Sequence, residues 1–376
     1  MMVCFKPSNI NLVLGFVTAI VLLYLFLPGD NRVQFEDLAL GEETHSIYVS
    51  VNNRKIHCND MINSKECVDS YYGLGSEQPV ILWLGNSQVH AINQPKINAE
   101  TAATKLHRKL QLEGKYFLTY SQPNANLQEH LILFSDLITK VPIATLVLPV
   151  VFDDLREDGI RNSLLPVFDN PEAVQLIKQS DIGVEIYEGL VTEKHTKNEL
   201  AGLDDSVQEK VELVLNERLK DSWVIWDERS SFRGQFLNFL YVSRNWIFGI
   251  NPSSTRKMIP GRYSRNMEAF LEILEMAKKN EITVFVYIVP LRNDVKIPYQ
   301  PKSYSQFKLK IEDETIQKGF YFSNFENIVP NNFWGYKAST NLNDDPEIDF
   351  MHFQEKGHEL LANAIYEKLL DITVKQ

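Results

Sequence analysis

Several features that mark other protein classes are scarce or missing in this chain. Basic residues are in deficit, with 38 Lys and Arg against 49 Asp and Glu, and the net charge of −11 argues against a nucleic-acid-binding protein, which needs a basic surface. The chain has no cluster of metal-ligand residues, no internal repeat and no low-complexity stretch. We therefore expect neither a metal nor another cofactor. A hydrophobic content of 44% is ordinary for a globular protein with a sizeable core.

Cysteine is also scarce, with three residues in 376. Cys4 precedes a long apolar run, whereas Cys58 and Cys67 follow it in a polar stretch. A disulfide between Cys58 and Cys67 would close a small loop, stabilise the fold by about 2–3 kcal/mol, and persist in an oxidising compartment. The alternative is that the two cysteines are free and merely close in sequence.

The apolar run, Ile10–Leu27, resembles a membrane-spanning segment. Its 18 residues are at the short end of what crosses a hydrocarbon core. Lys6 and the free amino terminus precede the run and only Arg32 follows it closely, which favours a cytoplasmic N-terminus and an extracytoplasmic remainder. The alternative is a cleaved signal peptide, but no small-x-small cleavage site follows. We expect residues 1–29 to be an uncleaved, single-pass signal anchor.

Apolar segments that alternate with amphipathic ones predict the rest of the fold. Strands are expected at Val80–Leu84, Tyr116–Tyr120, Thr145–Val151, Thr283–Val289 and Gly319–Phe322, with Pro149 as an early end for the third. Helices are expected at 99–112, 127–140, 266–279 and from Phe353 onward. This alternation is typical of an α/β fold with a doubly wound parallel sheet. Residues 30–78 are interpreted as an extracytoplasmic lead-in and 79–376 as the main domain.

An insertion at about 152–265 is longer than a simple crossover requires. Charged helices are expected at Asp181–Lys194 and Ser206–Leu219, followed by aromatic clusters around Trp223, Phe239 and Trp246. An insertion at this edge of the sheet is well placed to cover an active site, and its aromatics could line a glycan groove or rest on a membrane. The alternative is that they form the insertion's own small core.

Two short motifs suggest chemistry. Gly85-Asn86-Ser87-Gln88 follows the first core strand, and Asp349-Phe350-Met351-His352 precedes the closing helix. The carboxyl ends of parallel strands are where open α/β sheets place their active sites. A serine becomes a nucleophile when a base accepts its proton and an acid orients that base. Ser87, His352 and Asp349 supply these three roles.

These two motifs, in this order, resemble the SGNH/GDSL hydrolase superfamily. That family places its serine in a Gly-Asp-Ser block after the first strand and its acid and base in a late Asp-x-x-His block. Here asparagine replaces the aspartate of the first block, and Asp349-x-x-His352 is unchanged. The resemblance covers about 80–150 and 280–370 and implies an SGNH/flavodoxin-like sheet with a catalytic Ser87, Asp349 and His352.

The family's oxyanion hole is the part this chain does not reproduce. The backbone N–H of Ser87 is one natural donor, but the chain lacks the family's glycine after the second strand and its Gly-x-Asn after the third. Asn124 or Asn126 could supply an amide donor and Arg156 a charged one. The alternative is that these residues only shape turns.

Other polar residues near the strand ends have competing interpretations. Arg292 follows the fourth strand and could hold an anionic group of the substrate, or form a surface ion pair with Asp294. His90 could approach the site or be a turn residue. His130 and His358 lie on helical stretches, where a lone histidine usually has a packing or surface role.

The resemblance extends to membrane-anchored, extracytoplasmic members that act in the acylation of cell-surface polymers. It implies an O-acyl, and specifically acetyl, esterase or acyltransferase that acts on an envelope polysaccharide beside a multispanning acyl-exporting partner. A second hypothesis is a lipase or lysophospholipase held at the membrane. A third is a catalytically silent glycan-binding or assembly subunit.

Overall fold

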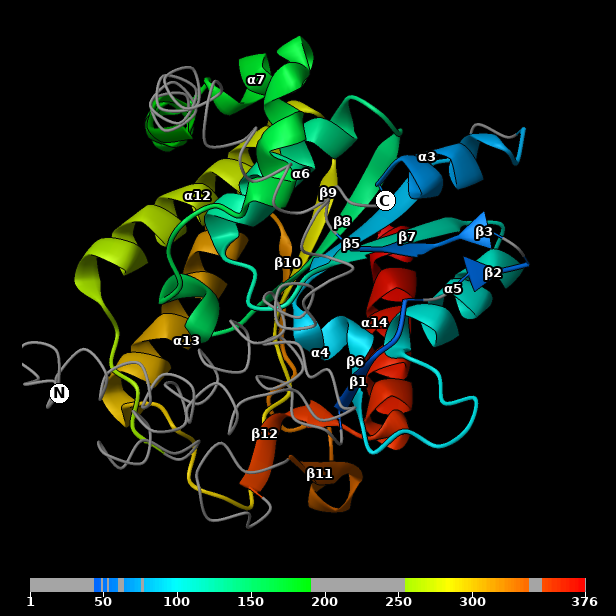
Figure 1. The fold of residues 1–376 in the computed structure, drawn as a ribbon, viewed down its shortest axis with the longest axis vertical. Coiled ribbons are helices and arrows are strands. Elements are labelled where there is room, and N and C mark those ends of the chain that lie inside the picture. Colours follow the sequence, from blue (N-terminus) through cyan, green and yellow to red (C-terminus); the bar gives the residue numbers. More distant parts are fainter. Residues whose placement is uncertain are drawn as a thin grey trace, which may run out of the picture. The chain divides into compact units, whose positions relative to one another are not determined.

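The protein is built around a six-stranded parallel sheet. The computed structural model describes residues 44–48, 50–52, 54–59, 64–75, 78–190, 254–337 and 347–375. The strand order is β10-β9-β8-β5-β7-β4, and every neighbouring pair is parallel (Figure 1). The strands are β4 (His57–Cys58), β5 (Val80–Gly85), β7 (Tyr116–Ser121), β8 (Ile143–Val150), β9 (Thr283–Ile288) and β10 (Tyr321–Asn324).

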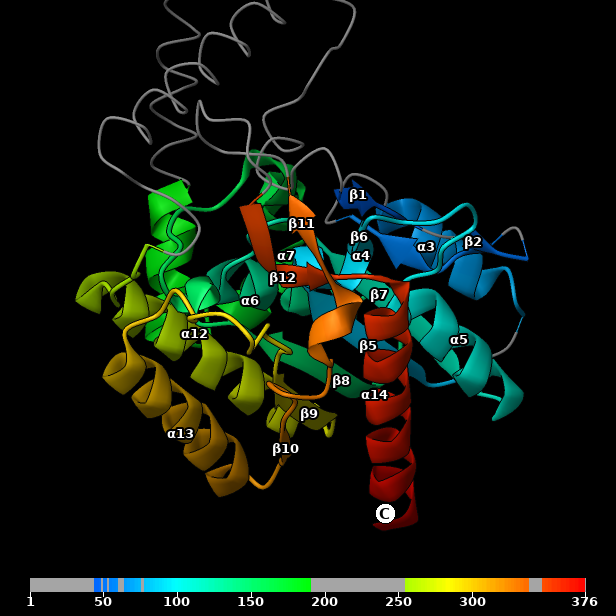
Figure 2. The same cartoon turned by 90° about the horizontal axis from the view of Figure 1, so that it is seen from below.

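Helices cover both faces of this sheet (Figure 2). Buried side chains of α5 (Ala102–Leu112) and α14 (Glu355–Lys375) pack together in one core cluster. Those of α6 (Leu127–Ile138), α12 (Pro260–Lys279) and α13 (Pro301–Gln317) belong to the other. Side chains of β5 and β7 alternate between the two clusters, as a strand buried on both faces requires. The predicted doubly wound α/β architecture is therefore present.

Several helices and strands begin or end at residues other than those predicted, and each difference has a local cause. Helix α5 begins at Ala102 because the Thr101 side chain caps it by accepting from the Thr104 N–H. Pro149 does not end β8 early, because β8 pairs with β5 only as far as Val147 and continues beyond it beside β9. Helix α12 begins at Pro260, where a proline at the first helical position is favoured.

The lead-in contributes to the main sheet. The predicted disulfide joins Cys58, in edge strand β4, to Cys67 in helix α3 (Ser64–Tyr72). Both cysteines are fully buried. Strands β2 (Ser50–Val51) and β3 (Arg54–Lys55) form a small antiparallel pair just before β4. Strand β4 thus belongs to the main sheet although it lies in the predicted lead-in, so the sheet includes residues on both sides of the domain boundary predicted between residues 78 and 79.

The first part of the predicted insertion packs on helix α6. It contains η1 (Asp153–Leu155), η2 (Asn162–Asp169), α7 (Pro171–Ile177) and a helical stretch at 181–190. Leu155, Leu164 and Ile177 join the same buried cluster as α6. This part therefore enlarges the core. The predicted helix at Ser206–Leu219 and the aromatic clusters at 223–248 lie outside the described residues.

Short antiparallel strands surround the carboxyl ends of the main sheet. Strand β1 (Thr44–Ser46) pairs with β6 (Ala91–Asn93), and β11 (Trp334–Lys337) pairs with β12 (Glu347–Phe353) after η3 (Asn331–Phe333). Asp349 and His352 both lie on β12, a strand that the sequence analysis did not predict. No helix of the described part is long and apolar enough to span a membrane, and the predicted anchor at 1–29 lies outside that part.

Candidate active site

Ser87 sits at a sharp turn between a buried strand and a short helix. Strand β5 ends at Gly85, and Ser87 begins α4 (Ser87–His90). Asn86 caps this helix, because its side-chain oxygen accepts from the Gln88 N–H at 3.1 Å. Glycine is needed at position 85, since a Cβ there would overlap the Val89 side chain. The turn holds Ser87 at the carboxyl edge of the sheet, where it is 9% exposed.

The structure brings the two sequence motifs into direct contact. Ser87 Oγ lies 2.9 Å from His352 Nε2, and His352 Nδ1 lies 2.9 Å from Asp349 Oδ2. Because the Asp349 carboxylate accepts hydrogen bonds, it places the imidazole proton on Nδ1. Nε2 is then free to accept the hydroxyl proton of Ser87. The three side chains are therefore connected in the order that nucleophilic catalysis requires.

Asp349 is held as a carboxylate by its surroundings. Its side chain is 4% exposed, and burial alone would raise its pKa. The His352 imidazole and the hydrogen bonds from His352 and Met351 outweigh burial and lower the pKa of Asp349 to about 2. Each backbone N–H of these two residues lies 2.9 Å from Asp349 Oδ1. The acid that orients the base is thus ionised throughout the neutral range.

The amide side chains of two residues fix the positions of the two sequence motifs relative to each other. Gln88 Nε2 donates to the carbonyl oxygens of Pro290 and Met351, at 2.9 and 2.8 Å, and so ties α4 to β12. Asn93 Nδ2 lies 3.3 Å from Asp349 Oδ2 and 2.9 Å from the Tyr336 carbonyl oxygen. Sequence reasoning did not single out either residue. Gln88 lay within the quoted motif, but Asn93 carried no sequence signal.

The asparagine that replaces the family's aspartate has a buried acid as its partner. Asn86 Nδ2 donates to Asp154 Oδ1 at 3.4 Å, and the Val151 N–H donates to Asp154 Oδ2 at 2.8 Å. Burial raises the pKa of Asp154 well above its usual range, although both hydrogen bonds oppose this. The Asn86–Asp154 pair ties the Ser87 turn to the segment that follows the neighbouring strand β8.

The four side chains predicted to bind oxyanion or substrate have other surroundings. Asn126 caps α6, and its Nδ2 donates to the Gly159 carbonyl oxygen at 2.8 Å. Asn124 is exposed, with the left-handed φ of 50° typical of a turn. Arg156 is paired with Asp153 at 2.7 Å, and Arg292 with Asp294 at 2.7 Å.

Among the described residues, none of these four forms a hydrogen bond with Ser87, Asp349 or His352. In place of the predicted oxyanion roles, Asn126 Nδ2 donates to the Gly159 carbonyl oxygen and the Arg156 guanidinium is paired with Asp153. Arg292 takes the alternative role of an ion pair, although its side chain is 8% exposed and therefore buried rather than on the surface. Its Nη1 also donates to the Gly335 carbonyl oxygen at 2.9 Å.

Three further histidines, His57, His90 and His358, have hydrogen-bond partners outside the triad. His90 Nδ1 lies 2.8 Å from Ser121 Oγ, which lies 2.6 Å from His57 Nε2. Burial holds the pKa of His90 far below its usual range and lowers that of His57 to about 3. His358 is fixed between the Ala102 N–H and the Ala91 carbonyl oxygen. These imidazoles are neutral packing groups at physiological pH.

Gln122 is a polar residue near the site that sequence reasoning did not single out. It follows β7 directly, and its backbone N–H donates to the Gly85 carbonyl oxygen at 3.2 Å. Its side chain is 1% exposed, and neither amide atom has a hydrogen-bond partner among the described residues. A buried amide normally finds partners, so the lack of one among the described residues calls for an explanation. The described part contains no group of three or more side chains that could hold a metal ion.

Comparisons with known proteins find only distant structural likeness. No family model matches the chain, and no curated protein matches it significantly. A GDSL-like lipase from Bacteroides thetaiotaomicron is 12% identical, with a TM-score of 0.37 over 81% of this chain and 98% of that protein. A protein described as an acylhydrolase, from Bacteroides fragilis, is 11% identical, with a TM-score of 0.37 over 78% of this chain and 90% of its own. A proposal for this chain's chemistry therefore depends on its own residues.

Proposed function

We propose that this protein is a serine-dependent O-acyl esterase or acyltransferase. The observation that carries the proposal is the continuous chain of hydrogen bonds from Asp349 through His352 to Ser87. Such a chain makes a serine hydroxyl nucleophilic at neutral pH. If these three residues had only a structural role, His352 would not need to bond the Asp349 carboxylate through one ring nitrogen and the Ser87 hydroxyl through the other, at the edge of the sheet.

In the proposed reaction, Ser87 Oγ attacks the carbonyl carbon of an ester while His352 Nε2 takes the hydroxyl proton. The tetrahedral intermediate then collapses, His352 returns this proton to the departing alcohol, and the acyl group stays on Ser87. Water or a second hydroxyl attacks the acyl-enzyme with His352 as the base, and His352 then returns the proton to Ser87 Oγ as its bond to the acyl group breaks. Water gives hydrolysis, and an acceptor hydroxyl gives acyl transfer. Asp349 stabilises the imidazolium that forms in each half-reaction.

The oxyanion of the intermediate needs hydrogen-bond donors, and we assign two. The N–H of Ser87 is at the start of α4, where a helix leaves N–H groups without partners. The second donor is the side-chain amide of Gln122. Gly85 and Ser121, the last residues of β5 and β7, are paired in the sheet. The residues that follow them, Asn86 and Gln122, therefore lie next to each other. The unpartnered amide of Gln122 then replaces the family's missing donors.

The substrate we propose is an acyl ester, with acetyl as the favoured group, on an envelope polysaccharide. The resemblance to membrane-anchored polymer-acylation proteins supports it, as does the disulfide between Cys58 and Cys67, which fits an oxidising compartment. The predicted anchor at 1–29 would hold the domain outside the membrane, beside a multispanning acyl-exporting partner. Preference for long acyl chains would instead favour the lipase or lysophospholipase.

The experiment that tests the proposal uses the purified full chain in detergent and p-nitrophenyl acetate. We expect Ser87→Ala and His352→Ala each to lower kcat by about 10³–10⁶-fold, because removing one member disables the triad. Circular dichroism of each variant shows whether it is folded. A folded wild-type chain without hydrolysis, and without labelling by a fluorophosphonate, would contradict the proposal and favour the silent glycan-binding subunit.

A further inference from the structure

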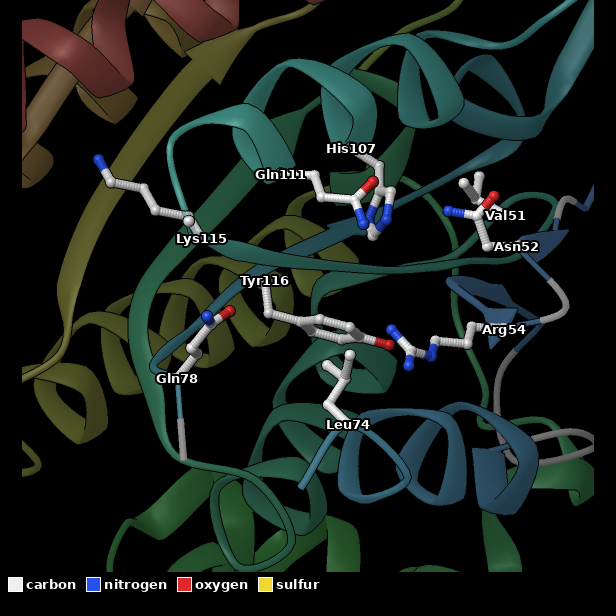
Figure 3. Close-up of a pocket in the computed structure, with 10 residues that line it drawn as sticks. Val51, Asn52, Arg54, Leu74, Gln78, His107, Gln111, Lys115 and Tyr116 are labelled. Carbon is white, nitrogen blue, oxygen red and sulfur yellow. The ribbon is translucent and has the colours of Figure 1, made fainter. Parts of the chain in front are cut away.

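A separate cavity opens at the other end of strand β7. It has a volume of about 160 Å³ and lies between helix α5, the start of β7 and strands β2 and β3 (Figure 3). Ser87 follows the carboxyl end of β5, whereas Tyr116 in this cavity begins β7 at its amino end. The cavity is therefore not part of the triad site. At about 30 Å³ per water molecule it holds about five waters, which suits a ligand smaller than a drug molecule.

One positive charge faces the cavity without a carboxylate partner. Lys55 lies 3.9 Å from Glu66, but the adjacent Arg54 forms no ion pair in the part of the chain that is described. The cavity lining contains no Asp or Glu. Lys115 also lines it, but its ammonium group points away in Figure 3 and donates to Thr373 at 2.9 Å. The guanidinium of Arg54 therefore favours an anionic ligand.

A hydroxyl without a partner is aimed at the same place. Tyr116 is 4% exposed, and its hydroxyl has no hydrogen-bond partner among the described residues. Figure 3 shows this hydroxyl and the Arg54 guanidinium pointing toward each other. A buried hydroxyl without a partner destabilises a fold unless something binds it. The phenol can donate to an oxyanion or accept from a ligand hydroxyl.

A histidine supplies the acceptor. His107 Nδ1 lies 3.0 Å from the Phe117 carbonyl oxygen, so this nitrogen carries the proton and Nε2 is left as an acceptor. Burial, and to a lesser degree the nearby Arg108 and Arg54, lower the pKa of His107 and keep it neutral. The side-chain amide of Gln111 is also part of the lining. A site for inorganic phosphate would be expected to offer donors alone, whereas this cavity pairs one cation with groups that also accept.

We propose that this cavity binds a single sugar-acid unit. The carboxylate of the ligand pairs with Arg54, and its hydroxyls bind the Tyr116 phenol and His107 Nε2. The inference goes beyond the proposed esterase activity and does not depend on it, because no triad residue contributes to the cavity. In a protein that acts on a charged polysaccharide, the site would hold one acidic residue of the polymer away from the ester being cleaved.

The test is calorimetric titration of the purified full chain with D-glucuronate, D-glucose, acetate and inorganic phosphate. We expect saturable binding of one glucuronate, at least about tenfold tighter than that of each other ligand, which is a difference of about 1.4 kcal/mol. Arg54→Gln and Tyr116→Phe should each weaken glucuronate binding by about tenfold or more. Lys55→Gln is the matched control and should bind normally, because Lys55 is the neighbouring cation outside the cavity.

The Tm and the esterase activity of each variant show whether a loss of glucuronate binding comes from the cavity or from misfolding. Tyr116→Phe removes an unpartnered hydroxyl, so its Tm should match or exceed that of the wild type, which a purely structural role would not allow. Hydrolysis of p-nitrophenyl acetate should be unchanged in all three variants. Absence of saturable glucuronate binding at about 10 mM, equal binding of acetate or phosphate, or an equal loss in Lys55→Gln would each overturn the proposal. Binding of a short oligogalacturonate as well as of the free acid would identify the ligand as a polymer end.

Discussion

The proposed role of the Gln122 side-chain amide as an oxyanion donor can be tested by changing that single residue. We expect Gln122→Met, which keeps the length of the side chain but removes its donor, to lower kcat by about 10²–10³-fold. The free energy of unfolding should stay the same or rise, because neither amide atom has a partner to lose within the described part of the chain. Steady-state hydrolysis and urea unfolding measure the two quantities. Unchanged kcat together with lower stability would show that Gln122 acts in packing.

Asp349 gives a second prediction at this scale, on activity. Asp349→Asn places an amide beside His352 Nδ1 and favours the wrong imidazole tautomer, so kcat should fall by about 10³–10⁴-fold. Asp349→Glu is the comparison variant, because it keeps the negative charge but moves the carboxylate relative to His352. Equal activity in the wild type and Asp349→Asn would show that the acid does not orient the base.

The same carboxylate links stability to pH. Its folded-state pKa of about 2 lies below the ordinary value of 3.8, so its ionised form favours the folded state. This contribution, on the order of 2 kcal/mol, is fully present above the unfolded pKa and is lost as the pH falls through about 2. The difference in unfolding free energy between wild type and Asp349→Asn should therefore shrink between pH 5 and about pH 2 in urea titrations. A constant difference would contradict the assigned hydrogen bonds.

At the scale of secondary-structure elements, edge strand β4 is the most dependent on a covalent link. It has two residues, and its disulfide to α3 is the kind of constraint that stabilises a short segment. Cys58→Ser with Cys67→Ser should lower the free energy of unfolding by about 2–3 kcal/mol, as for other small loops. Urea unfolding with and without dithiothreitol measures the effect. The reductant should destabilise the wild type and leave the double variant unchanged, and any effect on that variant would point to another cause.

Predictability from sequence also differs among the elements. The buried strands β5, β7 and β9 were predicted because long apolar runs have few alternatives in a parallel sheet. Strand β4 was missed because two residues carry no periodicity. Strand β12 was also missed, because its pairing with β11 joins segments that no local sequence pattern links.

For the site, the three triad residues lie in short motifs and could be read directly. The residues that hold them in place could not, because their contacts cross the whole chain. The bond from Gln88 to Met351 spans 263 residues, and that from Asn93 to Asp349 spans 256. The predicted oxyanion candidates Asn126 and Arg156 are engaged in other contacts. Asn favours helix caps and Arg forms ion pairs, and these local roles were satisfied first.

At the scale of the whole molecule, the proposed function requires the domain to lie outside the cytoplasm. The apolar run Ile10–Leu27 and the Lys6–Arg32 asymmetry predict an uncleaved anchor with this orientation. We expect the protein in native membranes to resist alkaline carbonate extraction and to keep the full mass of 43.4 kDa. Protease added to spheroplasts should digest it, whereas a cytoplasmic control protein should survive.

Two results would contradict this topology. A shorter chain released by carbonate would indicate a cleaved signal peptide, and protection from external protease would indicate the reverse orientation. The thiols give an independent readout, because Cys58 and Cys67 should resist maleimide labelling until reduced, whereas Cys4 should remain a free cytoplasmic thiol. Agreement between the two measurements would place Ser87 and the sugar-acid cavity on the side of the membrane where an envelope polysaccharide is found.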